Sequence, residues 1–238
     1  MNKSRGAIAL VGSGEYLPVM QELESQLLRI AVARGKKNTF VQIPTAAGRE
    51  SRESIKFWKE RGEIQVARIG AQSIFIPVLT REDAFNEDFI TLIEDAGLIY
   101  FSGGDPGYLA QVFSGTPLWG AIVKAWHDGS SLAGCSAGAM AFGEKIVGIR
   151  LTHAINGLGL LPDIEVIPHF DKFLGWVPEK ITAAIMRPDA GTKLIGIDEN
   201  TALICTDRWR VFGEGGVHIL RGIIAAPKTF RAGETVDI

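Results

Sequence analysis

A serine lies between two glycines in segment 132–142, which reads LAGCSAGAMAF. Apolar residues precede Gly134 and helix-forming alanines follow Gly138, so the pattern predicts a strand, a sharp turn and a helix. A G-x-S-x-G sequence at such a junction is typical of a nucleophile elbow, whose small neighbours allow a tight turn that exposes the hydroxyl. Ser136 is the predicted nucleophile, and the Ala137 N–H is a predicted oxyanion donor. The alternative is that the small residues only allow close helix packing, with Ser136 as a helix cap.

Cys135 is the neighbouring residue that could also act as a nucleophile. A nucleophilic cysteine in such a turn would occupy its centre. Cys135 comes one residue earlier, so we expect it to point back into the sheet. This register favours Ser136.

A serine nucleophile needs a general base, and the chain has four histidines. His169 comes where the predicted strand in IEVIPHF ends and a loop begins, a place from which an imidazole could reach a neighbouring turn. His127 is expected near a helix C-terminus, where it would interact with exposed carbonyls. His153 and His218 lie in β-like segments, where a structural role is expected. His169 is therefore the predicted base.

The imidazole in turn needs a carboxylate to fix its tautomer and stabilise its protonated form. The pair Asp198 and Glu199, in LIGIDENTALI, is flanked by apolar runs on both sides, so these charged groups need partners. A plain turn with Asp198 as a local cap is the alternative. Spacing alone leaves six candidates open: Asp105, Asp163, Glu165, Asp171, Asp198 and Glu199.

Two glycines end the predicted strand in IYFSGGDPGYL, just before a helix that we expect to start near Pro106. Glycines there let a backbone N–H approach a substrate carbonyl oxygen, and we expect Gly104 to supply the second oxyanion donor. A plain strand-to-helix turn is the alternative. The segment VGSGEYL does not fit a dinucleotide-binding loop, because Leu17 replaces the third glycine and Glu15 would repel a phosphate.

Short apolar runs alternate with amphipathic helical patterns in the first half of the chain, which predicts a doubly wound, mostly parallel α/β sheet with helices on both faces. The predicted strands are segments 7–12, 39–44, 73–79, 98–103 and 131–136. After Met140 the β-like runs are shorter, so we expect antiparallel strands to extend the sheet. These runs are KIVGIRLTH, IEVIPHF, LIGID, TALICT, RWRVFG and GVHILRG. No linker or repeat is present, which predicts a single domain over residues 1–238.

Composition limits the partners and the location of the protein. The 238 residues carry a formal net charge of −2, with scattered Lys and Arg, which argues against nucleic-acid binding. The two cysteines form no C-x-x-C pair, which argues against a disulfide scaffold or a zinc knuckle, so we expect no metal and a reducing cytoplasm. We also expect no cofactor. The first apolar run breaks at Gly12, too early for a signal peptide, and no run approaches the roughly 18 residues of a membrane span. The sequence leaves open whether the protein forms a homodimer.

Six segments together resemble the peptidase E and cyanophycinase family of serine peptidases, whose fold is similar to class I glutamine amidotransferases. They occur in the family's order over nearly the whole chain: IPTAAG, YFSGGDPGYL, LAGCSAGAMAF, GLGLLPDIEVIPHF, LIGIDENTAL and FGEGGVHIL. The resemblance implies a catalytic Ser136, His169 as base, and Glu199 as the acid, by its match to the family's G-I-D-E segment. Some relatives of peptidase E place the acid between serine and histidine. Within this interval the segment GIRLTHAING holds no Asp or Glu, which favours Glu199.

The departures from the family bear on the substrate. Cyanophycinases typically carry D-Q-H-F followed by arginines, and a glutamine after the G-G-D/N turn. This chain has Ile167-Pro168 before His169, no arginine cluster after it, and Pro106 in place of the glutamine. We therefore expect a short peptide rather than cyanophycin, and the isolated PHF is closer to peptidase E, which cleaves dipeptides beginning with aspartate.

The predicted function is hydrolysis of small peptides by a serine peptidase through an acyl-enzyme. The alternatives are a non-catalytic relative that binds a metabolite, a cyanophycinase-type exopeptidase, and an esterase or acyltransferase. A helix N-terminus near Ser136 would favour acidic groups of the substrate. Five side chains could contact or cover such a peptide: Arg49, Arg52, Lys172, Phe173 and Trp176.

Overall fold

The main sheet of the protein has eight strands. The computed structural model describes residues 5–147, 155–172, 191–220 and 228–238. In these residues the sheet order is β14-β11-β10-β1-β5-β4-β2-β3, and the run from β1 to β3 is parallel throughout. The strands β10, β11 and β14 join antiparallel. This confirms the predicted fold class. The bounds are β1 Ile8–Val11, β2 Thr39–Ile43, β3 Gln72–Phe75, β4 Leu98–Phe101, β5 Ser131–Cys135, β10 Thr201–Cys205, β11 Trp209–Gly213 and β14 Thr235–Val236.

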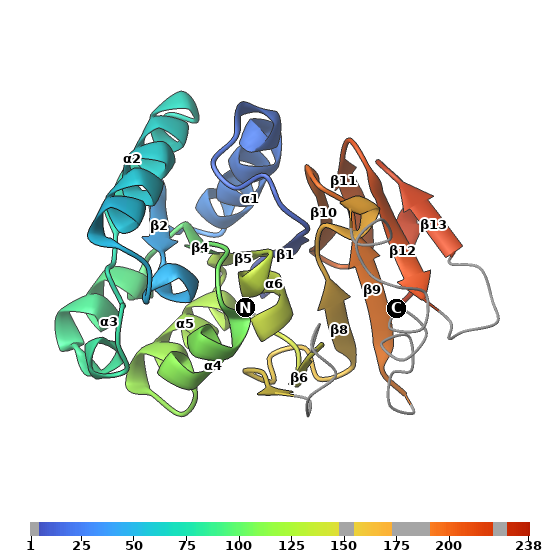
Figure 1. The fold of residues 1–238 in the computed structure, drawn as a ribbon. Coiled ribbons are helices and arrows are strands. Elements are labelled where there is room, and N and C mark those ends of the chain that lie inside the picture. Colours follow the sequence, from blue (N-terminus) through green and yellow to red (C-terminus); the bar gives the residue numbers. More distant parts are fainter. Residues whose placement is uncertain (1–4, 148–154, 173–190, 221–227) are drawn as a thin grey trace.

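Helices cover both faces of this sheet (Figure 1). On β1, Ala9 and Val11 pack in one buried cluster with residues of α1 and α2, whereas Ile8 and Leu10 pack in another with residues of α3 to α6. This two-sided burial is why the parallel strands read as continuous apolar runs. The helices are α1 Gln21–Ala33, α2 Arg52–Arg68, α3 Glu87–Glu94, α4 Pro106–Phe113, α5 Pro117–His127 and α6 Ala137–Ala141, with short 3₁₀ helices at Pro18–Met20, Thr45–Ala47 and Glu82–Phe85.

A second sheet, of four strands in the order β13-β12-β9-β8, lies beside the first (Figure 1). The sequence pattern does not separate this second sheet from the main sheet, because a β-like pattern identifies a strand but not its partners. β8 and β9 are parallel, with Ile167 opposite Gly196, so their C-terminal ends lie side by side. The bounds are β8 Ile164–Ile167, β9 Lys193–Ile197, β12 Gly216–Leu220 and β13 Lys228–Arg231, and a two-stranded ribbon pairs β6 Lys145–Ile146 with β7 Ile155–Asn156.

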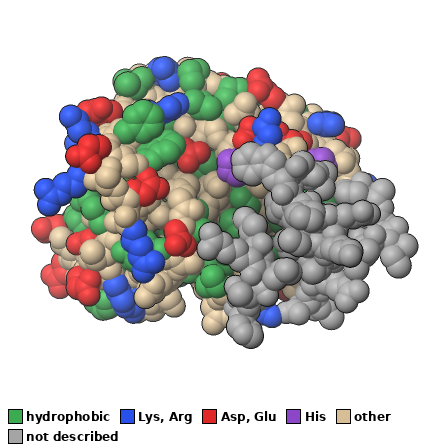
Figure 2. Space-filling model, in the orientation of Figure 1, with side chains coloured by type: hydrophobic (Ala, Val, Ile, Leu, Met, Phe, Trp, Pro, Cys, Tyr) green, Lys and Arg blue, Asp and Glu red, His purple; other side chains and the backbone are tan. Residues whose placement is uncertain are grey.

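The surface carries charges of both signs. Figure 2 shows Lys and Arg interspersed with Asp and Glu over the helical side of the molecule. Across the described ranges, every helix is too short or too polar to cross a membrane.

Glu24 of α1 is fully buried, and its Oε2 accepts a hydrogen bond from Gln65 Nε2 at 2.6 Å. Burial raises the pKa of its carboxyl group from 4.5 to about 8. The stability that the proton confers is therefore complete below about pH 4.5 and is lost as the pH rises through about 8.

We expect Glu24→Gln, which mimics the protonated acid, to gain stability relative to the natural protein as the pH rises from about 5 to about 8. The difference in unfolding free energy should grow by up to about 1.4 kcal/mol per pH unit. Urea unfolding of both proteins at the two pH values measures it. A difference that stays constant with pH would show that Glu24 ionises normally in the folded state.

Candidate active site

The turn between β5 and α6 carries Ser136 in a strained backbone conformation, with φ 49° and ψ −107°. The turn has no room for larger neighbours. A Cβ on Gly134 would lie 2.5 Å from the carbonyl carbon of Gly138, and one on Gly138 would lie 2.7 Å from the Phe101 oxygen. The predicted strand, sharp turn and helix are thus all present, and both glycines are required by contacts with backbone atoms.

Ser136, His169 and Glu199 lie in one chain of hydrogen bonds. Ser136 Oγ is 3.1 Å from His169 Nε2, and His169 Nδ1 is 3.0 Å from Glu199 Oε1. With the ring proton on Nδ1, His169 donates to Glu199 and accepts from the serine hydroxyl, which is the arrangement that general-base catalysis needs. The parallel pairing of β8 and β9 explains the second contact, because His169 and Glu199 each follow the end of one of these strands.

Asp171 contacts the backbone of Glu199. Its Oδ1 accepts a hydrogen bond from the Glu199 backbone N–H at 2.9 Å, and Thr201 Oγ1 donates to the Glu199 carbonyl at 2.9 Å. Of the other candidate acids, Asp105 caps α4 through the Tyr108 N–H. Asp163 precedes β8 and Glu165 lies within it.

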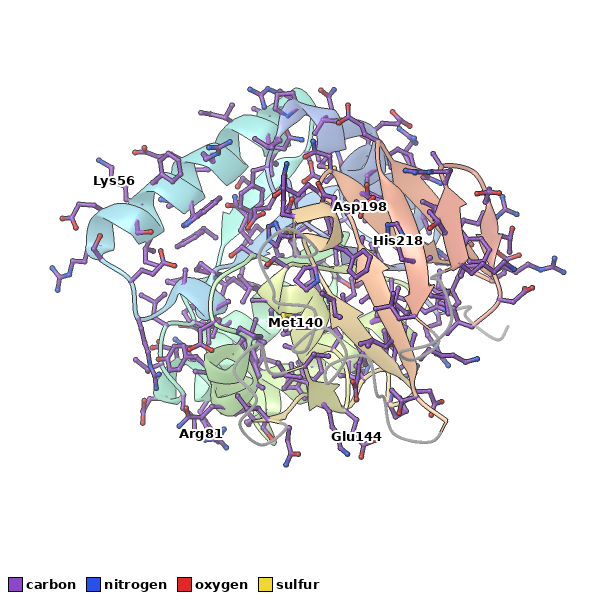
Figure 3. The ribbon with its side chains drawn as sticks, turned by 45° about the vertical axis from the view of Figure 1, so that its right-hand side comes forward. Lys56, Arg81, Met140, Glu144, Asp198 and His218 are labelled. Carbon is purple, nitrogen blue, oxygen red and sulfur yellow. The ribbon has the colours of Figure 1, made fainter. Side chains whose placement is uncertain are left out.

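Asp198 and His218 form a separate pair (Figure 3). His218 Nε2 lies 2.9 Å from Asp198 Oδ1, and Asp198 Oδ2 accepts from the Gly216 N–H at 2.7 Å. The His218 ring also packs on Phe170, at 4.7 Å between ring centres. The structural role expected for His218 fits these contacts, and the pair supports the residues that flank His169 and Glu199. His127 is the last residue of α5, as expected, and His153 lies outside the described residues.

Cys135 points into the buried cluster on one face of the sheet, as expected. It is fully buried in the cluster under α1, and its thiol donates to Glu15 Oε2 at 3.1 Å. Burial, and then the charge of Glu15, raise the pKa of the Cys135 thiol well above its ordinary value. Cys135 is therefore a protonated thiol and a poor nucleophile.

The loop after β4 lies against the nucleophile turn. A Cβ on Gly103 would lie 3.5 Å from Ser136 Cβ, which places this loop next to the hydroxyl. The Gly103 N–H donates to Glu15 Oε1 at 3.1 Å. Gly104 follows with φ 138°, and a Cβ there would lie 2.4 Å from the Ala46 oxygen, so this position also requires glycine. Of the two N–H groups, Gly104 is the one that Glu15 does not occupy.

Four non-glycine residues of the described chain have positive φ, and each lies in or beside this site. They are Tyr16, Ser136, His169 and Asn200, with φ values of 49° to 60°. Such conformations cost about 1–3 kcal/mol each and are retained mainly at functional sites. Tyr16 draws attention to its neighbour Glu15, which sequence reasoning considered only as an obstacle to phosphate binding. The sequence did hold a signal for Glu15: it comes just after β1, the parallel neighbour of β5, so it lies at the same sheet edge as Ser136.

Three of the five residues predicted to contact the substrate lie in the described part of the chain. Arg49 is exposed, with its guanidinium 4.1 Å from the centre of the Tyr108 ring, and Arg52 is the first residue of α2. Lys172 lies 3.9 Å from Asp171. Phe173 and Trp176 fall outside the described residues.

Ser136 follows β5 of the mostly parallel sheet, whereas His169 and Glu199 follow β8 and β9 of the second sheet. A serine, a histidine and a carboxylate in one hydrogen-bonded chain are the arrangement of groups found in serine hydrolases. Residues 8–210 match Peptidase family S51, and the chain belongs to that family. The resemblance to the peptidase E and cyanophycinase family is thereby confirmed.

Relatives and solved structures agree with this assignment. Cyanophycinases of Synechococcus elongatus and Thermosynechococcus vestitus are each 32% identical over 166 residues, which is 64% of this chain and 50% of theirs. The chain thus spans about half the length of these curated relatives. The crystal structure of a peptidase from an acI-B1 Actinobacterium is 47% identical, with a TM-score of 0.94 over 100% of this chain and 99% of that one. A peptidase E protein of Listeria monocytogenes, 18% identical with a TM-score of 0.62 over 89% and 100% of the two chains, shares the fold.

Proposed function

We propose that the protein is a serine peptidase that hydrolyses small peptides through an acyl-enzyme. The observation that carries this proposal is the hydrogen-bonded chain from Ser136 Oγ through His169 to Glu199. Membership of Peptidase family S51 supports it. A protein that only binds a metabolite has no need to hold a strained serine against a histidine and a carboxylate, so the intact geometry favours hydrolysis over binding.

In the proposed mechanism, His169 Nε2 takes the proton of Ser136 as Oγ attacks the peptide carbonyl. The Ala137 and Gly104 N–H groups donate to the oxyanion that forms. His169 then gives its proton to the leaving amine, which departs, and a water molecule hydrolyses the acyl-enzyme with His169 again acting as base. Glu199 stays ionised and stabilises the imidazolium.

The proposed substrate is a short peptide with an acidic first residue. Pro106 begins α4 where cyanophycinases typically have glutamine, and Ile167 ends β8 before His169, so the side chains expected for cyanophycin are missing at both positions. Arg49, which follows the 3₁₀ helix Thr45–Ala47, is the cation that we propose contacts an acidic side chain. Both cysteines are free thiols, which supports a reducing, cytoplasmic location. A homodimer stays a prediction.

Turnover of a dipeptide library by the purified protein tests this proposal. We expect Asp-X dipeptides to be cleaved faster than neutral X-X dipeptides and faster than β-Asp-Arg. Faster cleavage of neutral or basic first residues would contradict the acidic preference. Rapid release of β-Asp-Arg from cyanophycin would show that the missing glutamine and arginines do not decide the substrate.

A further inference from the structure

Glu15 places a carboxylate beside the proposed nucleophile. It follows β1 and is partly exposed, with Oε1 bonded to the Gly103 N–H and Oε2 to the Cys135 thiol. A Cβ built on Gly103 would lie 2.7 Å from Glu15 Oε1 and 3.5 Å from Ser136 Cβ. The carboxylate is therefore a neighbour of the reacting hydroxyl, although it takes no part in the hydrogen-bonded chain to Glu199.

Among the residues that the structure describes, the contacts of Glu15 do not balance its charge. An amide N–H and a thiol that stays protonated are both neutral partners. Among the ion pairs of the described residues, none involves Glu15. A partly buried charge without a counter-ion is costly, and this one sits in a loop whose next residue, Tyr16, has a strained φ of 60°. A loop that retains both an unbalanced charge and a strained residue is expected to bind a ligand.

The proposed reaction indicates that this ligand is positively charged. An oxyanion that forms beside Ser136 is repelled by a neighbouring carboxylate, which raises the barrier unless a positive group lies next to both. In a peptide with a free N-terminus, the α-ammonium nitrogen is two bonds from the carbonyl carbon of the first residue. When Ser136 attacks that carbonyl, the ammonium group arrives next to the nucleophile.

We propose that Glu15 binds the α-ammonium group of the substrate, so that the site takes peptides with a free N-terminus and cleaves after their first residue. This proposal rests on the proposed peptidase function and assigns its specificity. An acidic side chain of the first residue would then contact groups other than Glu15, such as Arg49.

The test compares each cleaved dipeptide with its N-acetylated form, for the natural protein and for Glu15→Gln. Glutamine keeps the shape of the side chain and an oxygen for the Gly103 N–H but loses the charge. We expect the natural protein to prefer the free amine by about 100-fold or more in kcat/KM, because charge-assisted contacts are strong in a partly desolvated site. Glu15→Gln should lower kcat/KM for the free peptide by about 10- to 100-fold and leave the acetylated peptide unchanged or faster. Glu22→Gln, on the exposed face of α1, is the matched control and should behave as the natural protein.

A neutral fluorophosphonate that labels Ser136 separates the possible failures. Equal losses on both peptides in Glu15→Gln, with labelling slowed to the same extent, would show that Glu15 only holds the loop, and the proposal would be wrong. Equal cleavage of free and acetylated peptides by the natural protein would also overturn it while leaving the peptidase function intact. Labelling of Ser136 without cleavage of any peptide would instead count against the peptidase function itself.

Discussion

Replacement of Ser136 by alanine should lower kcat/KM for a cleaved dipeptide by about three to six orders of magnitude. Replacement of His169 should have a similar effect, because Oγ is 3.1 Å from Nε2 and the two groups act together. For the same reason the double variant should be little worse than either single variant. Steady-state kinetics of the three variants, at equal folded concentration, measure these effects.

Cys135→Ser is the matched control for this experiment. A serine hydroxyl can keep the hydrogen bond to Glu15 Oε2, and the buried thiol faces away from the turn, so activity should be largely retained. Loss of activity in Cys135→Ser with tolerance of Ser136→Ala would mean that the nucleophile is assigned one residue too late.

Replacement of Glu199 by glutamine should lower kcat by about 10²- to 10⁴-fold with a smaller change in KM. Glutamine can keep a contact with His169 Nδ1 but does not stabilise the imidazolium, and its amide group can hold the ring in the wrong tautomer. Measurement of kcat and KM for the natural protein and for Glu199→Gln over a series of pH values tests this prediction.

Asp171→Asn is the comparison for Glu199→Gln. Asparagine keeps an oxygen for the Glu199 N–H, so we expect a loss of about tenfold at most. A larger loss in Asp171→Asn than in Glu199→Gln would identify Asp171, one of the six candidates from the sequence, as the acid that acts on His169.

The parallel half of the fold is predictable from the sequence because its strands are buried on both faces. Runs such as 98–103 therefore read as continuous apolar segments between amphipathic helices. The second half is only partly predictable. Where the structure describes them, its β-like runs overlap β6, β8, β9, β10, β11 and β12. Nothing in a single strand shows that β10 joins β1 whereas β9 joins β8 in another sheet.

The candidate site is also only partly predictable from the sequence. Ser136 could be located because a tight turn needs small residues around it, and Gly134, Ala137 and Gly138 show this pattern within one short segment. His169 and Glu199 are 30 residues apart in sequence, and their contact depends on the pairing of β8 with β9. The residues alone left six acids open. Glu15 was missed as part of the site because its importance comes from contacts with Gly103 and Cys135, which only the assembled sheet brings together.

Mass spectrometry of the intact protein after reaction with a fluorophosphonate tests the central claim most directly. We expect one adduct on the natural protein, located by peptide mapping on Ser136, none on Ser136→Ala, and slow labelling of His169→Ala. Glu24→Gln serves as a folded control that should label normally. A folded natural protein that stays unlabelled, or an adduct that persists in Ser136→Ala, would contradict the assignment of Ser136 as an activated nucleophile.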